Sequence, residues 1–118
     1  MGLLEVYSLD ISNLTSFASM FSSCENLTTI QGTENWKTTN IKSMNSTFQS
    51  CKKLISLNCT NWDVSNVKRM QSTFDKSKFN GDLSKWDVSN VENMSWLFTN
   101  STFNNDSICD WDVSNVNN

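Results

Sequence analysis

The hexapeptide WDVSNV, residues 62–67, occurs three times without change in this chain of 118 residues. The other two copies are residues 86–91 and 111–116, so the motif returns after 24 and then 25 positions. A catalytic motif is normally needed once, whereas a phrase repeated at a near-constant interval is typical of units stacked on one another. The hexapeptide therefore predicts a repeat architecture.

Two weaker copies extend the pattern toward the N-terminus, LDISNL at residues 9–14 and WKTTNI at residues 36–41. The first positions of the five copies advance by 27, 26, 24 and 25. The columns that follow the motif are Phe17, Met44, Met70 and Met94, then Phe21, Phe48, Phe74 and Phe98. One asparagine is common to all copies: Asn13, Asn40, Asn66, Asn90 and Asn115. We therefore expect a single domain, residues 1–118, of about four to five units of 24–27 residues.

The apolar spacing within a unit predicts its local structure. Val67, Met70 and Phe74 follow the i, i+3, i+7 pattern of one helix face, with Ser65 as a candidate N-cap and Asp63 at the positive end. This helix would have about two turns, and packing would have to stabilise it.

Upstream of each motif, a short strand is expected. Residues 54–59, with Leu54, Leu57 and Cys59, have the L-x-x-L-x-L spacing of a leucine-rich repeat. The residues three before the motif should stack inside: Val6, Thr33, Cys59, Leu83 and Ile108. The expected fold is α/β, a leucine-rich-repeat-like right-handed solenoid of short parallel strands and short helices.

Composition narrows the classes of function. Nine basic and twelve acidic residues give a net charge of −3, which disfavours a nucleic-acid surface. No apolar run is long enough to span a membrane, and no signal peptide is visible. The chain has no His, and its four Cys form no CxxC pair, so we expect no zinc site, no cofactor and no enzymatic activity.

The stretches NWDVSNVKRMQSTF, FNGDLSKWDVSNVENMSWLF and CKKLISLNCTNWDVSNV resemble the repeat of BspA-like leucine-rich surface proteins. They resemble more closely a repeat family of unknown function in mycoplasma-type and Gram-positive surface lipoproteins and adhesins. The resemblance covers residues 4–116 and departs at Leu9, Lys37, Thr38, Thr47, Thr73 and Leu97. It implies a secreted or cell-surface solenoid used for adhesion, with no reaction and no binding residues to transfer.

The repeated Trp, Asn and Asp columns have structural and functional interpretations. A row of Trp could bind sugars or bases, but a core ladder is favoured because apolar neighbours accompany it in every unit. The Asn column is interpreted as a buried ladder that bonds the next unit, and the repeated Asp as a cap rather than a calcium ligand. Trp96 stands where other units have Ser, so it is either part of an interface or packed locally.

The cysteines and sequons leave alternatives open. Cys24 and Cys51 occupy equivalent positions and could form a disulfide, although two buried thiols are favoured. If the source were a eukaryotic secretory protein, four sequons would be plausible glycosylation sites. These are Asn45, Asn93, Asn100 and Asn105.

The leading functional hypothesis is an extracellular or cell-surface module that binds a protein or glycan. Exposed strand-side positions and the distinctive Trp are its candidate binding residues: Glu5, Asn58, Thr60, Asp82, Ser84 and Trp96. The alternative is a structural subunit that stacks head-to-tail with copies of itself, because the units show no polar caps. Such open ends would equally suit a segment of a longer repeat protein. An ice-binding solenoid is a weaker third hypothesis, since only Thr38–Thr39 forms a Thr pair in the motif.

Overall fold

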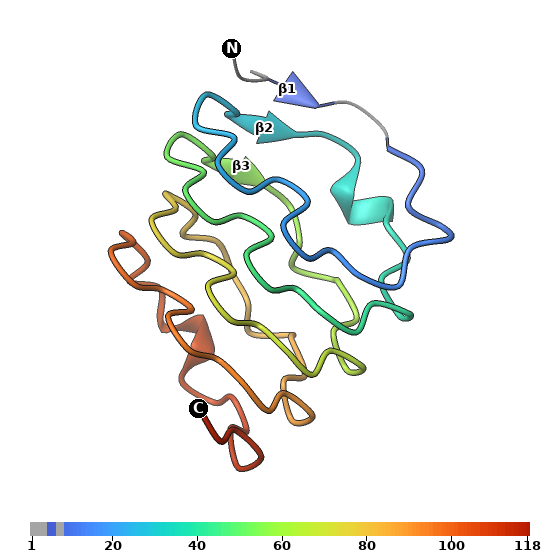
Figure 1. Cartoon of the computed structure of the whole chain (residues 1–118), viewed down its shortest axis with the longest axis vertical. Helices are drawn as coiled ribbons and strands as arrows, with labels where there is room; N and C mark the ends of the chain where they lie inside the picture. Colours follow the sequence, from blue (N-terminus) through green and yellow to red (C-terminus); the bar gives the residue numbers. More distant parts are fainter. Residues whose placement is uncertain (1–4, 7–8) are drawn as a thin grey trace.

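The computed structural model describes residues 5–6 and 9–118, which wind in successive coils, each beside the one before (Figure 1). Each coil crosses one wall of the molecule, turns, and returns across the opposite wall. Three two-residue strands lie on the first wall: β1 (Glu5–Val6), β2 (Thr29–Ile30) and β3 (Ser56–Leu57). There are two 3₁₀ helices: η1 (Thr33–Asn35) lies between β2 and β3, and η2 (Asp106–Ile108) lies near the C-terminus. We call the wall that carries the three strands the strand wall.

The strands are parallel and neighbour one another in chain order, β1-β2-β3. Val6 pairs with Ile30, and Ile30 pairs with Leu57. The expectation that Val6 and Thr33 share a column is therefore wrong, because Val6 lies three residues before its copy of the motif, whereas its partner Ile30 lies six residues before Trp36. Thr33, Cys59 and Leu83 are buried as expected, whereas Ile108 is only partly buried against the core.

The opposite wall, which we call the turn wall, comprises residues 15–24, 41–51, 67–77 and 91–101. Its coils pair in parallel at Ser16, Ser43, Arg69 and Asn93. Every second N–H donates to a carbonyl of the next coil, as in Met44 N to Arg69 O at 2.8 Å and Phe48 N to Thr73 O at 2.9 Å. Successive coils are thus joined by a backbone ladder on this wall as well.

The prediction of a short helix after the motif is wrong, because the described residues contain no α-helix. Residues 70–73 and 74–77 instead form two consecutive turns, closed by Thr73 N to Met70 O and Ser77 N to Phe74 O. Their third residues, Ser72 and Lys76, both have φ of 59°, as a type II turn requires. Ser65 and Asp63 therefore cap no helix.

Two physical reasons explain this error. Turns repeating every four residues return Met70 and Phe74 to the core, and with Val67 this reproduces the apolar spacing of a helix. The ladder between coils also holds neighbours about 4.8 Å apart, whereas a helix with side chains is about 10 Å wide. The short rise per coil therefore excludes a helix on this wall.

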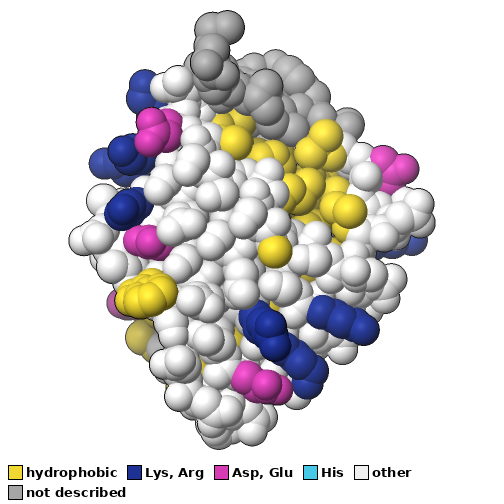
Figure 2. Space-filling model, viewed as in Figure 1, with side chains coloured by type: hydrophobic (Ala, Val, Ile, Leu, Met, Phe, Trp, Pro, Cys, Tyr) yellow, Lys and Arg dark blue, Asp and Glu magenta, His cyan; other side chains and the backbone are white. Residues whose placement is uncertain are grey.

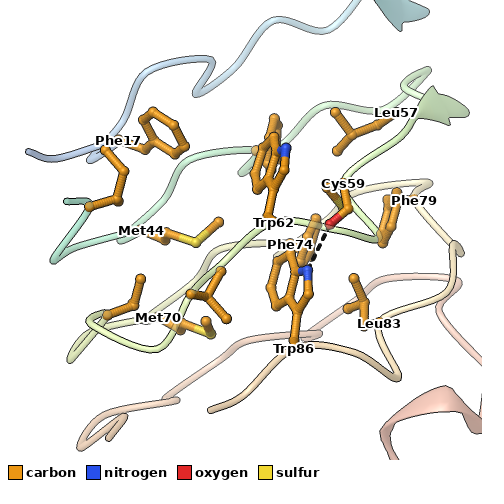
Figure 3. Close-up of a cluster of buried hydrophobic side chains, with 14 of the residues drawn as sticks. Phe17, Met44, Leu57, Cys59, Trp62, Met70, Phe74, Phe79, Leu83 and Trp86 are labelled. Atoms are coloured by element: carbon orange, nitrogen blue, oxygen red, sulfur yellow. Dashed lines mark hydrogen bonds between the residues drawn. The ribbon is translucent and has the colours of Figure 1, made fainter. Parts of the chain in front are cut away.

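Side chains from the two walls meet in a core of stacked rings (Figure 3). The Trp62 indole lies 5.5 Å from that of Trp36 and 6.3 Å from that of Trp86, with interplanar angles of 14° and 10°. A parallel column from the turn wall stacks Phe48 on Phe74 at 5.5 Å. The Trp column is therefore a core ladder, and equivalent side chains meet across successive coils.

The indoles of Trp62 and Trp86 also donate hydrogen bonds to the preceding coil, whereas the buried Nε1 of Trp36 has no partner among the described residues. Trp62 Nε1 donates to Thr33 O and Trp86 Nε1 to Cys59 O, both at 2.8 Å. These bonds satisfy a polar group that would otherwise be costly to bury. They also fix the register between coils. The assignment to a right-handed leucine-rich-repeat-like solenoid stays a prediction.

Candidate binding surfaces

Four of the predicted binding residues lie together on the strand wall. Asn58 and Thr60 belong to one coil, and Asp82 and Ser84 occupy the corresponding positions of the next. They alternate with buried side chains such as Cys59, so they face outward. Thr60 Oγ1 donates to the backbone carbonyl of Asp82 at 3.2 Å, which joins the two coils. We call these four residues the strand face.

Asp82 is the one ionisable side chain of the strand face. Its Oδ1 accepts the N–H of Ser84 at 2.9 Å, and this bond, with that from the Ser84 side chain, lowers the pKa of Asp82 below its usual value. The strand face therefore presents one fixed negative charge beside two hydroxyls and an amide. Glu5 was predicted to extend this face, but its side chain lies outside the described part of the chain.

Trp96 lies on the turn wall, so it does not share a site with the strand face. Its side chain is 61% exposed, and its φ is 58°. The equivalent residues Ser19, Ser46 and Ser72 have φ of 57–59°. The sequence left two alternatives for Trp96, an interface and local packing against the end of the stack, and the exposure of the side chain favours the first.

The Asn column forms the expected ladder, but it is not buried. Asn66 Nδ2 donates to Thr39 O at 2.7 Å, and Asn90 Nδ2 donates to Ser65 O at 2.8 Å. Both side chains lie at the exposed corner between the walls. An amide needs only one carbonyl of the preceding coil to hold its position, so burial is not required.

The repeated Asp residues close turns beside that corner. Asp63 Oδ1 accepts the N–H and the hydroxyl of Ser65, at 2.9 and 2.6 Å. Asp87 makes the same pair of bonds with Ser89. These bonds lower the pKa of both carboxyl groups, while the neighbouring carboxylates Asp63 and Asp112 oppose the shift at Asp87. Within residues 5–6 and 9–118, no group of three or more His, Cys, Asp or Glu could hold a metal ion.

The cysteines are thiols in the structure. Cys51 is buried, and its Sγ donates to Phe21 O at 3.1 Å. Burial raises the pKa of Cys51 to about 12, and the proximity of Cys24 adds to this shift. Burial also raises the pKa of Cys59. These two groups are therefore poor nucleophiles at neutral pH.

A hollow lies at the edge where the turn wall passes into the strand wall. It measures about 390 Å³ and is lined by Lys52, Lys76, Ser77, Lys78, Asn100 and Thr102. Figure 2 shows dark-blue side chains gathered along this edge at the left, where Figure 1 places the green and yellow turns. We call this hollow the lysine cleft. Sequence reasoning did not identify this hollow, because the coils that bring its residues together are about 25 residues apart in the chain.

No helix within the described part of the chain is long and apolar enough to cross a membrane.

A family model described as a Mycoplasma protein of unknown function, DUF285, matches residues 15–118. No curated protein and no solved structure matches the chain. The matched region begins in the first coil of the turn wall and includes the strand face, Trp96 and the lysine cleft.

Proposed function

We propose that this chain, which belongs to DUF285, a Mycoplasma protein family of unknown function, is a non-enzymatic module that binds a protein or glycan at the cell surface. The kinship to BspA-like repeats and the solenoid assignment form part of this proposal. The observation that carries it is the conformation of Trp96.

Trp96 combines an unfavourable backbone with an exposed indole. A bulky residue at positive φ is a genuine outlier, and such a conformation costs about 1–3 kcal/mol. Other coils place Ser at this position, and burial does not offset the cost here because the side chain is 61% exposed. An exposed indole on a rigid wall suits contact with the apolar face of a sugar or with an interface pocket.

The test compares Trp96→Ser with wild type on an array of printed glycans and extracellular-matrix proteins. We expect saturable binding by wild type and at least a tenfold loss in Trp96→Ser. The matched control is Ile55→Ser, which removes another large apolar side chain that is 76% exposed. Retention of binding by Trp96→Ser, or no binding by wild type to any spot, would contradict the proposal.

A second variant in the same binding experiment tests whether the strand face contacts the ligand. Asn58→Lys with Ser84→Lys places two long cationic side chains over the face without changing a buried residue. Loss of binding in this variant while Trp96→Ser keeps it would contradict the role of Trp96 and would assign the ligand to the strand face instead. Loss in both variants would indicate two contact areas for one ligand.

Head-to-tail assembly remains a second candidate because the two edges of the turn wall are complementary. Among the described residues, no carbonyl accepts the N–H groups of Trp96, Phe98 and Asn100, although their counterparts in inner coils are all bonded. At the other edge, the carbonyls of Ser16 and Ala18 accept no backbone N–H from residues 5–6 or 9–118. If the donor edge of one copy paired with the acceptor edge of the next, the copies would form an open-ended filament in which all of them point in the same direction.

Sedimentation velocity between about 10 and 500 µM tests this candidate. Val113 is 49% exposed, whereas its counterpart Val88 is 2% exposed, so Val113→Asp should suppress assembly without a core defect. A monomer at every concentration would refute the assembly and leave the binding proposal intact.

A further inference from the structure

We propose that the lysine cleft binds a small ligand carrying a sulfate or phosphate group, at a site separate from the strand face and from Trp96. The proposal joins three observations: the chemistry of the lining, the arrangement of the lysines on neighbouring coils, and the size of the hollow.

The exposed polar side chains that line the cleft can all donate hydrogen bonds. Lys52, Lys76 and Lys78 contribute ammonium groups, Asn100 contributes an amide, and Thr102 contributes a hydroxyl. No carboxylate lines the cleft. In a chain of net charge −3, three of the nine basic residues line this one hollow. Several hydrogen-bond donors with no carboxylate among the lining residues favour an oxyanion.

The fold places these donors on consecutive coils. Lys78 N donates to Cys51 O at 3.4 Å, which brings the backbone of Lys78 beside that of Lys52. Lys76 N donates to Thr99 O at 2.9 Å, which places the next coil against the other side. The buried Ser77 lies between the two lysines of the middle coil, and its Oγ accepts the N–H of Phe79.

Two acidic residues, Glu25 and Asp75, lie near this edge, and neither forms an ion pair with Lys76 or Lys78. Glu25 pairs with Lys52 at 3.3 Å, with both side chains more than half exposed, so the pair is weak. Asp75 is buried and accepts a hydrogen bond from Gln49 Nε2 at 3.2 Å. Lys76 and Lys78 form no ion pair with the described residues.

The backbone conformation of Lys76 also fixes the position of its side chain at the cleft. Its φ of 59° belongs to the third residue of a type II turn, and Ser50 and Asn100 share that conformation on either side. The turn therefore fixes where the Lys76 stem leaves the wall. The hollow of about 390 Å³ exceeds the volume of a bare oxyanion and falls within the range of small-ligand pockets. A sugar ester fits these dimensions and this chemistry.

The test is NMR titration of the ¹⁵N-labelled chain with glucose 6-phosphate and glucose 6-sulfate in about 50 mM salt, with glucose as the neutral control. We expect saturable shifts at the amides of residues 76–78 and 100–102, none with glucose, and at least tenfold weaker binding in 0.5 M salt. The two esters distinguish a phosphate from a sulfate ligand.

Two triple variants separate the site from general charge. The first variant removes the three ammonium groups of the cleft by the changes Lys52→Gln, Lys76→Asn and Lys78→Gln. Asn is used at position 76 because it tolerates positive φ, as Asn100 does. Lys37→Gln, Lys42→Gln and Lys85→Gln remove equal charge elsewhere. We expect at least tenfold weaker binding only in the first variant, with the spectrum outside the cleft unchanged. Equal loss in both variants, equal shifts with glucose, or no shift at 20 mM of either ester would overturn the proposal. Trp96→Ser should leave these shifts unchanged, so this test is independent of the proposed function.

Discussion

Replacing Trp62 by Phe tests whether the indole ladder stabilises the stack. Trp62 is 3% exposed and lies between the indoles of Trp36 and Trp86. The substitution keeps an aromatic ring, removes the Nε1 donor at 2.8 Å from Thr33 O, and leaves a void where the second ring was.

The magnitude follows from these two losses. Thr33 O still accepts the N–H of Trp36 at 3.1 Å, so the lost hydrogen bond costs about 1 kcal/mol rather than the full penalty of an orphaned carbonyl. The smaller ring adds about 1–2 kcal/mol, part of the 3–5 kcal/mol typical of complete truncation. A loss of about 2–3 kcal/mol lowers Tm by about 8–12 °C in a domain of this size.

Urea and thermal unfolding, followed by circular dichroism, measure the loss. The matched control is Trp111→Phe, because Trp111 is only partly buried, stacks on Trp86 and donates to Leu83 O at 3.1 Å. We expect about 1 kcal/mol for the control. Equal costs for the two variants would refute the reasoning, since burial would then make no difference.

Three further predictions concern the turn wall, the thiols and the Asp column. Trp96→Ser should keep or raise the free energy of unfolding, by up to about 1 kcal/mol, because it removes a bulky residue from positive φ; a clear destabilisation in urea would show that the indole is packed. In a thiol-reagent titration at pH 8, the exposed Cys109 should react first, while Cys51 and Cys59 should react only after unfolding, because burial raises their pKa; rapid reaction of all four thiols would contradict their burial. The pKa of Asp63 and Asp87 is lowered in the folded chain, so their stabilising contribution is present above the ordinary pKa near 3.8 and is lost as pH falls through the folded value. The urea midpoint should therefore fall below about pH 4, and less so in Asp63→Asn with Asp87→Asn.

The candidate site illustrates how far sequence reasoning extends. The alternation of apolar and polar residues correctly placed Asn58, Asp82 and Ser84 on an exposed face, because strand side chains point to opposite sides. The substitution of Trp for Ser at position 96 marked it as unusual. Its exposure was left open because a column position alone does not state whether a side chain points inward. The lysine cleft escaped notice because Lys52 and Lys78 are neighbours only through the contact between coils.

The sequence by itself determined the period, the five copies and the Trp and Phe columns, since each unit needs its neighbours to bury its apolar side chains. Only the tertiary structure decided the local conformation after the motif. Four-residue turns and a helix bury the same spacing of Val67, Met70 and Phe74, so periodicity cannot separate them. Hydrogen bonds between coils decide the choice, because backbone N–H groups that pair with the next coil are no longer free to form a helix.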